Sequence, residues 1–223
     1  MFVDRMYRLA RRWSNEELRT LAPVFKGDVV NVSAWDDRDK EGGHYKDYFV
    51  NATSYSYTNY EGYRGFQGVS HEYSLDLIGE VPEELRKRFD VVFNHTTLEH
   101  IYDVRRAFTN LCKLSRDVVI IVVPFAQVLH ESDDWKDYWR FTPACLRELF
   151  KENNLAVVYE AKNPQKNCGI YLLFIGSRQP HFWKGQVPVY QPIATSGEWI
   201  GGSVVQHVAR KIRRILRLFR SND

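Results

Sequence analysis

The sequence predicts an α/β core built on a mostly parallel, doubly wound sheet, and three observations support this fold class. Segments rich in β-branched residues alternate with segments of helical apolar spacing, which is typical of α/β folds. Residues 117–125, "DVVIIVVPF", form a continuous apolar run, as in a central parallel strand covered on both faces. Only six residues, 162–167, separate the last two strand-like segments, whereas a parallel crossover needs about a dozen or more. The predicted sheet therefore has seven strands and ends in an antiparallel hairpin.

Each element follows from local pattern. The seven strands are expected at 28–32, 52–60, 72–77, 89–94, 117–125, 155–161 and 168–177. Helices are expected at 3–13, from 14 to about 21, and at 82–88, 96–114, 143–153 and 203–220. Ser14 fits the N-cap of a capping box that starts the second helix, and Thr142 fits an N-cap followed by Pro143.

The composition bounds the domain organisation and the compartment. With 44% hydrophobic residues and a net charge of +3, a chain of 223 residues supports one full core. We expect a helical flank at 1–26, the core at 27–178, an extended wrap or linker at 179–202 and a basic amphipathic helix at 203–223. The three cysteines lack metal-binding or paired spacing, and no segment resembles a signal peptide or a membrane span. These features favour a cytoplasmic protein.

Polar and aromatic residues follow the predicted parallel strands where each strand ends. In an open α/β sheet, ligands bind beyond the carboxyl ends of the strands. A mixture of hydroxyls, amides, one carboxylate and apolar walls suits an adenosine-type ligand. The candidate ligand-binding residues are Val32, Ser33, Ala34, Trp35, Asn59, Tyr60, Asp76, Leu77, Asn94, His95 and Thr97.

Two segments then carry a resemblance to a known family. "FDVVFNHTTLEHIYDVRRAFTNL" resembles the fourth-strand segment of class I S-adenosylmethionine-dependent methyltransferases, and the chain looks type 11-like within them. "VVPFAQVLHESDDWKDYWRFTPACLRELF" is similar to the following segment in a branch linked to sugar and polysaccharide modification. The resemblance is specific over residues 89–150 and looser over 28–88. It implies a Rossmann-like fold, S-adenosyl-L-methionine as the cofactor, and methyl transfer.

The first motif departs from the family pattern. Where the family has Gly-x-Gly after its first strand, this chain has Ser33 and Ala34, and the nearest glycines are Gly42 and Gly43. Small residues allow close approach of a ligand if the backbone φ stays negative. The family's second strand ends in an acid that binds the ribose hydroxyls, whereas Asn59 offers an uncharged amide here. The first loop is therefore expected to be a glycine-poor substitute.

His130 is the candidate catalytic residue, because a histidine near a ligand crevice can take a proton from a hydroxyl at neutral pH. The alternative is a hydrogen bond that anchors its loop. Glu99, His100, Trp139 and Arg140 are the candidate substrate-binding residues. For these the alternatives are helix-terminus stabilisation, packing at the crevice rim and packing against the sheet edge. His130 with the nearby Asp133, Asp134 and Asp137 has loose spacing, so no metal site is predicted.

The last predicted helix is basic and amphipathic. Residues 203–220 place an apolar face beside six Arg and Lys residues, which favours docking on an anionic membrane surface. The alternative is packing on the body of the protein or on a second subunit, as in a homodimer. Nucleic-acid binding is not expected, because the core lacks a basic stripe with aromatics.

Together these observations favour an S-adenosylmethionine-dependent methyltransferase. Its expected reaction is O-methylation of a sugar, polysaccharide or lipid-linked glycan, in the cytoplasm or at the inner membrane face. The alternative is a catalytically inactive protein of the same fold that serves as a binding or scaffold partner in glycan biosynthesis. A nicotinamide enzyme is disfavoured, because no GxGxxG follows the first strand.

Overall fold

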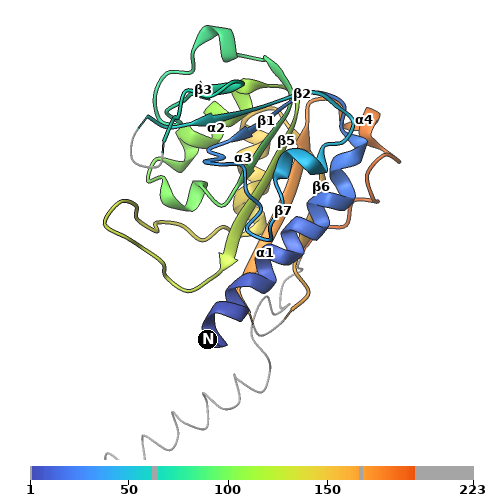
Figure 1. Cartoon of the computed structure of the whole chain (residues 1–223). Coiled ribbons are helices and arrows are strands. Elements are labelled where there is room, and N and C mark those ends of the chain that lie inside the picture. The colour runs from blue at the N-terminus through green and yellow to red at the C-terminus, as the bar shows by residue number, and fades with distance from the viewer. Residues whose placement is uncertain (1, 62–64, 166–167, 194–223) are drawn as a thin grey trace, which may run out of the picture.

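The computed structural model describes residues 2–61, 65–165 and 168–193, with side chains from residue 8 onward. Its sheet has seven strands in the order β3-β2-β1-β4-β5-β7-β6. Figure 1 labels all of them except β4. The strands are β1 (Gly27–Val32), β2 (Ala52–Asn59), β3 (Glu72–Ser74), β4 (Phe89–His95), β5 (Ser115–Ala126), β6 (Ala156–Lys162) and β7 (Ile170–Ser177). β7 runs antiparallel to β5 and to β6, and the other neighbouring pairs of described strands are parallel. The predicted fold class is confirmed.

Two apolar cores lie on the two faces of the sheet. Alternate residues of each strand point to opposite faces, so Val92 joins one core while Val91 and Phe93 join the other. The first core packs against α2 (Val104–Leu114) and α3 (Pro143–Glu152). The second packs against α1 (Phe2–Leu21), the short turn η2 (Tyr45–Tyr48) and α4 (Pro180–Trp183) (Figure 1).

The N-terminal segment is one helix, so the predicted break at Ser14 is wrong. Ser14 is buried, and its hydroxyl donates to the carbonyl of Arg11 and lies 2.9 Å from Nε2 of His95. A serine inside a helix can bond back to the preceding turn in this way. The capping-box pattern was overridden because tertiary contacts hold Ser14 in the helix interior.

The predicted helix at 96–114 is also too long. The chain first makes a 3-10 turn, η4 (Leu98–His100), and α2 begins after Asp103, whose carboxylate accepts from the amide of Arg106 at 3.2 Å. The helix predicted at 82–88 is likewise only a 3-10 turn, η3 (Glu83–Leu85). At α3, the predicted cap is present, because Thr142 Oγ1 accepts from the amide of Cys145. Glu99 and His100 therefore lie in a separate turn at the end of β4.

The connection between β1 and β2 contains no α-helix. Asp37, which is buried, accepts hydrogen bonds from Asn31 Nδ2, the Tyr55 hydroxyl and the amide of Lys46 at 2.7–3.0 Å. These bonds hold the connection against the sheet. Since α1 shares the core on this face, it covers apolar surface that a crossover helix usually covers.

Part of the predicted linker packs on the core. Trp183 is buried and donates its indole N–H to Asp117 at 2.8 Å, while Ile193 is buried on the opposite face. The predicted helix at 203–220 lies outside the described residues. Among the helices described, none is both long enough and apolar enough to cross a bilayer.

Candidate functional site

The candidate site lies at the carboxyl edge of the parallel strands. Val32, at the end of β1, pairs with Thr58 of β2 on one side and Asn94 of β4 on the other. Across β4, His95 pairs with Val122 of β5. The predicted ligand-binding residues at the ends of β1, β2 and β4 are thus brought together.

The loop after β1 is bound closely to the end of β2. The amides of Ser33, Ala34 and Trp35 donate to Thr58 Oγ1, the Thr58 carbonyl and Asn59 Oδ1 at 3.3, 3.1 and 2.7 Å. Ser33 has a φ of 57° and Trp35 one of 54°. The condition of a negative φ is not met at Ser33, because these bonds hold the residue in the left-handed region that glycine adopts more readily.

Asn59 uses its amide group within the protein. Its Nδ2 donates to the Trp35 carbonyl at 2.9 Å and to Glu72 Oε1 at 2.7 Å, and its Oδ1 accepts from the Trp35 amide. Both N–H donors are therefore used, and the residue is buried. In this conformation Asn59 locks the loop after β1, and a ribose contact would have to replace one of these bonds.

The other predicted ligand-binding residues differ in their exposure to solvent. Trp35 and Tyr60 are exposed, Leu77 belongs to the core, and Asp76 accepts from the Ile78 amide. Thr97 is half-buried beside the carbonyl of His95.

At the end of β4, the buried side chains of Asn94 and His95 differ in how their polar atoms are hydrogen-bonded. Asn94 donates to the Val32 carbonyl, but its Oδ1 has no hydrogen-bond partner in the described part of the chain. His95 lies between the hydroxyls of Ser14 and Thr96, and burial lowers its pKa well below 6.5. His95 is therefore a neutral, structural imidazole.

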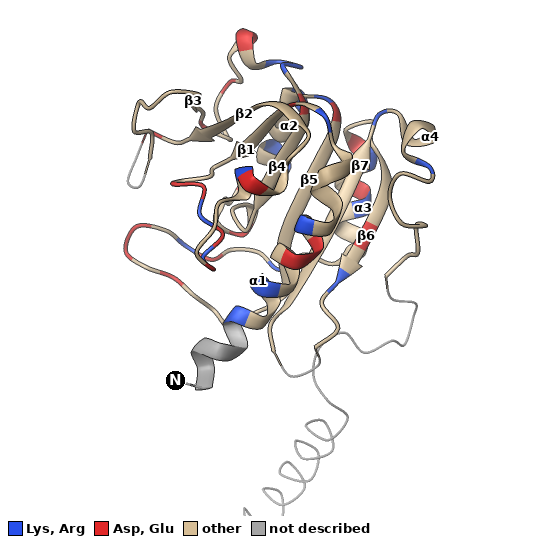
Figure 2. Cartoon of the chain, turned by 45° about the vertical axis from the view of Figure 1, so that its right-hand side comes forward, with Lys and Arg blue, Asp and Glu red and all other residues tan. Residues whose placement is uncertain are grey.

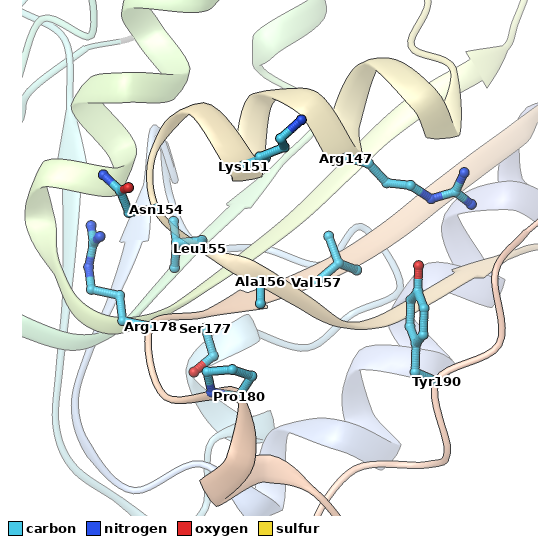
Figure 3. Close-up of a pocket in the computed structure, with 10 residues that line it drawn as sticks. All are labelled: Arg147, Lys151, Asn154, Leu155, Ala156, Val157, Ser177, Arg178, Pro180 and Tyr190. Atoms are coloured by element: carbon cyan, nitrogen blue, oxygen red, sulfur yellow. The ribbon is translucent and has the colours of Figure 1, made fainter.

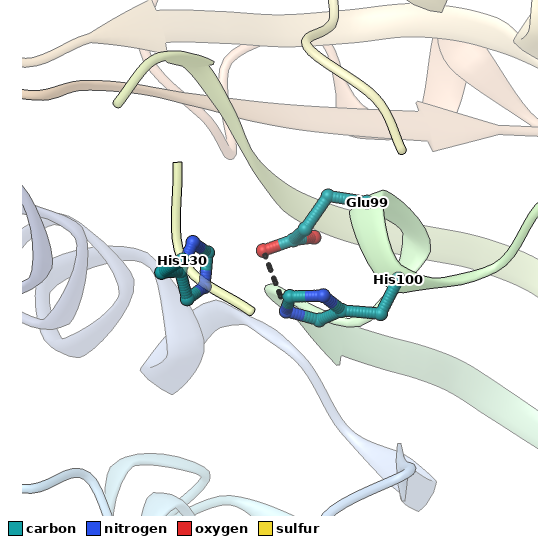
Figure 4. A group of neighbouring side chains, drawn as sticks. All are labelled: Glu99, His100 and His130. Carbon is teal, nitrogen blue, oxygen red and sulfur yellow. Dashed lines mark ion pairs between the residues drawn. The ribbon is translucent and has the colours of Figure 1, made fainter. Parts of the chain in front are cut away.

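Glu99, His100 and His130 form a compact cluster beside these strand ends (Figure 4). One nitrogen of each imidazole and one oxygen of the Glu99 carboxylate all lie within 4.8 Å of one another. His100 Nε2 is 3.8 Å from Glu99 Oε1. The sequence nominated all three residues, but for separate roles. One feature of the sequence could have predicted the cluster: Glu99–His100 and His130 follow adjacent parallel strands, so they lie at the same edge of the sheet.

The loop between β5 and α3 brings His130 to this position. The amides of Tyr138 and Trp139 donate to the Glu99 carbonyl at 2.8 and 3.2 Å, and the Phe141 amide donates to the Pro124 carbonyl at 2.9 Å. Figure 2 shows the acidic residues along this loop. Asp133 and Asp134 are exposed, and the residues that lie near His130 with atoms able to bind a metal are Glu99 and His100.

Burial shifts the pKa of all three residues of the cluster toward the neutral form. The Glu99 side chain is fully buried, and neither of its oxygens receives a hydrogen bond from another described residue. Burial raises the pKa of this carboxyl to about 8, and its own backbone amide and Arg11 only partly offset the effect. Burial also lowers the pKa of His100 and of His130. Both imidazoles therefore favour the neutral form, which is the form that accepts a proton or binds a metal.

The guanidinium of Arg140 binds other groups of its own loop in this structure. Its guanidinium pairs with both oxygens of Asp137 at 2.5 Å and donates to the carbonyls of Val128 and Trp139. Asp137 in turn accepts from the His130 amide at 3.0 Å and lies 3.2 Å from His130 Nδ1, and these partners hold its pKa near 2 against the effect of burial. In this conformation these bonds anchor the loop, and the acceptor contact of Arg140 stays a prediction.

Aromatic rings surround the rim of the cluster. Trp139 donates its indole N–H to the carbonyls of Ile101 and Tyr102 and leaves part of its ring exposed. Tyr102 and Tyr138 are exposed beside it, with ring centroids 5.4 Å apart. Trp135 packs edge-on against both histidines of the cluster.

A separate hollow of about 610 Å³ lies at the opposite edge of the sheet (Figure 3). Its lining includes Arg147, Arg178 and Ser177. Ser177 pairs with Val118, at the start of β5, so this hollow is at the amino end of the parallel strands. It is not part of the candidate site.

Solved methyltransferase structures share this fold at low sequence identity. The 1,6-didemethyltoxoflavin-N1-methyltransferase of Burkholderia thailandensis, with bound S-adenosylhomocysteine, is 16% identical, with a TM-score of 0.53 over 75% of this chain and 77% of that one. Magnesium protoporphyrin IX methyltransferase from Synechocystis PCC 6803, with bound S-adenosylmethionine, is 10% identical, with a TM-score of 0.56 over 79% and 84%.

A Haloferax volcanii protein in complex with the Trm112 methyltransferase activator is 13% identical, with a TM-score of 0.53 over 75% and 90% of the two chains. No family model matches the sequence, and no curated protein matches it. The likenesses to solved structures establish that this chain has the fold of the class I S-adenosylmethionine-dependent methyltransferases.

Proposed function

We propose that the protein is an S-adenosylmethionine-dependent methyltransferase that methylates a hydroxyl group. The observation that carries the proposal is the position of Glu99, His100 and His130 at the carboxyl edge, where α/β sheets of this order bind their ligands. Solved proteins of the same fold hold S-adenosylmethionine or S-adenosylhomocysteine, which supports the choice of cofactor.

The cofactor is proposed to lie along the ends of β1, β2 and β4. Its sulfonium supplies the methyl group when it is bound. The orphaned Oδ1 of buried Asn94 is an acceptor suited to an amino or hydroxyl donor of a ligand, and Trp35 and Tyr60 offer exposed rings for an adenine. Asn59 does not fit as a ribose ligand while it binds Trp35 and Glu72, so we assign it to holding the loop.

The acceptor is proposed to be a sugar, polysaccharide or lipid-linked glycan. The exposed rings of Trp139, Tyr102 and Tyr138 at the cluster rim support this, because aromatic faces stack well on sugar rings. The resemblance of residues 122–150 to a sugar-modifying branch supports it independently. The acceptor hydroxyl loses its proton as its oxygen bonds to the methyl carbon, and His130 is the proposed proton acceptor.

Calorimetric titration with S-adenosylmethionine and S-adenosylhomocysteine tests the proposal. Binding of both, weakened at least tenfold in Asn94→Leu and unchanged in Asn51→Ala, is expected. Asn51 is an exposed asparagine at the amino end of β2, which makes it a matched control. If neither ligand binds at millimolar concentration, the enzyme proposal fails.

The second candidate function is a non-catalytic binding or scaffold protein in glycan biosynthesis. It is favoured by the saturated amide of Asn59 and by Ser33 and Ala34, which stand where the family pattern has glycine. Binding of a glycan without binding of either cofactor form would establish it.

Membrane docking by residues 203–220, self-association and a cytoplasmic location remain proposals that rest on the sequence. Co-sedimentation with anionic liposomes, with and without residues 203–223, tests the docking. Equal pelleting of the two proteins would remove it.

A further inference from the structure

Glu99 presents a buried carboxylate that the protein itself does not satisfy. The side chain has no exposed surface, and neither oxygen has a hydrogen-bond partner among the described residues. Buried carboxylates are normally paired, hydrogen-bonded or bound to a metal. Arg11, whose charge acts on this carboxyl, donates instead to the Tyr45 hydroxyl and to Thr96 Oγ1 at 3.1 and 2.7 Å. Among the described residues, the group that faces this carboxyl is the imidazole of His100, whose Nε2 lies 3.8 Å from Glu99 Oε1.

Two imidazoles converge on the same point. His100 and His130 have ring centroids 5.0 Å apart at an interplanar angle of 77°, and both side chains are partly exposed (Figure 4). The three ligand atoms lie within 4.8 Å of one another, whereas ligands about 2.1 Å from a tetrahedral metal lie about 3.4 Å apart. Side-chain movements of about 1 Å would therefore close the cluster around an ion.

The surroundings hold both histidines in the way that metal ligands are usually held. His100 Nδ1 donates to the Lys136 carbonyl at 2.7 Å, which turns Nε2 toward Glu99. His130 Nδ1 lies 3.2 Å from the carboxylate of Asp137, which Arg140 fixes in turn. A metal-binding histidine typically donates its second ring nitrogen to a carbonyl or a carboxylate.

We propose that Glu99, His100 and His130 bind one divalent transition-metal ion, with Zn²⁺, Mn²⁺ or Co²⁺ as the favoured kind. Two imidazoles and one carboxylate suit these ions better than Mg²⁺ or Ca²⁺, which prefer sets of oxygen ligands. Three protein ligands leave at least one coordination position for water or a substrate oxygen.

The site deepens the proposed function, and its catalytic part rests on that function. A hydroxyl bound to the ion loses its proton more readily, as water does on zinc. With the ion bound, His130 would be one of its ligands, so solvent or buffer would take the place that the metal-free proposal gives to His130 as the proton acceptor. Metal binding itself does not depend on methyl transfer.

Titration of chelator-treated, full-length protein with Co²⁺ tests the site. One ion per chain is expected, with a visible ligand-field absorption band that Zn²⁺ abolishes by displacement. Glu99→Gln and His130→Ala should each weaken binding at least tenfold. His181→Gln is the matched control, because His181 is an exposed histidine far along the chain in α4, and it should bind as the unmodified protein does.

Two outcomes would overturn the site: no Co²⁺ binding below millimolar concentration, or equal affinity in Glu99→Gln, His130→Ala and the unmodified protein. Circular dichroism establishes that each variant is folded. His130→Ala keeps the test decisive if Glu99→Gln does not fold, because His130 lies in a loop.

Methyl transfer is measured separately in chelator and with added Zn²⁺ or Mn²⁺. Activity restored by the ion supports the catalytic part. Full activity in chelator overturns that part, whereas metal binding without methyl transfer to any acceptor leaves the site standing and counts against the proposed function.

Discussion

The two halves of the carboxyl edge satisfy their polar groups in opposite ways. On the β1–β2 side, the amides of the loop and the side chain of Asn59 bond to one another and leave few groups for a ligand. On the β4–β5 side, Glu99 is buried with no hydrogen-bond partner in the part of the chain that the structure describes, and two imidazoles lie beside it. Saturated polar groups stabilise a fold, whereas buried unsatisfied ones lower its stability and are retained where chemistry needs them.

The largest expected effect tests the β4–β5 half. His130→Ala should lower the turnover of methyl transfer by about 10²–10⁴-fold, because it removes the proposed group that assists loss of the hydroxyl proton. The measurement is initial-rate kinetics at saturating cofactor. His181→Gln should keep its full rate, and a His130→Ala protein with unchanged turnover would contradict the assignment.

Asn59→Ala tests the saturated half. It should lower the free energy of unfolding by about 2–4 kcal/mol, because the amide and carbonyl of Trp35 and the buried Oε1 of Glu72 each lose their bond to Asn59. Urea unfolding at equilibrium measures this.

Two control variants sharpen that result. Asn51→Ala removes one exposed bond to the Pro23 carbonyl and should cost less than about 1 kcal/mol. Glu99→Met removes a buried carboxyl with no hydrogen-bond partner, so it should leave stability unchanged or raise it by about 1 kcal/mol. A large loss of unfolding free energy in Glu99→Met would contradict the comparison, because it would mean that the Glu99 carboxyl makes stabilising bonds as Asn59 does.

His95 makes stability depend on pH. Its folded-state pKa is depressed by burial, with Arg11 and Lys40 adding to the shift, so below about pH 6.5 the unfolded chain binds a proton that the folded chain does not. The free energy of unfolding should therefore fall with decreasing pH, by up to about 1.4 kcal/mol per pH unit from this group.

Urea unfolding between pH 7 and pH 5 measures the slope. His100 and His130 shift in the same direction and add to it, so the informative quantity is the difference between the unmodified protein and His95→Gln. His181→Gln should keep the full slope, and an equal slope in His95→Gln would refute the role of His95.

The smallest expected effect concerns the loop after β1. Ser33→Gly should raise the free energy of unfolding by about 0.5–1 kcal/mol, because glycine adopts a φ of 57° without the strain that a side chain adds. Ser33→Val should lower it, and thermal unfolding resolves both changes. A stabilised Ser33→Val would mean that the loop adopts another conformation in solution.

Much of the framework was predictable from local pattern. The apolar run of β5 and the short gap before β7 predicted the mixed sheet, and Thr142 predicted the start of α3. The break at Ser14 and the long helix from 96 were wrong, because a buried partner at His95 and a cap at Asp103 decide these boundaries.

The candidate site was only partly predictable. The residues that follow each strand were identified, since parallel strands end at one edge. Their roles were not, because a hydrogen-bond partner is set by the path of a loop and not by spacing along the chain. Asn59 turns to Trp35 and Glu72, and Arg140 turns to Asp137.

By itself, then, the sequence determined the order of elements, the two apolar faces of the sheet and the edge at which a ligand is expected. Hydrophobic periodicity is local, and burial of apolar faces leaves few arrangements of such elements. Only the tertiary structure decided that the loop after β1 closes on Asn59 and that Glu99, His100 and His130 meet. These contacts join residues far apart in the chain, and their energies depend on burial and direction, which no local pattern encodes.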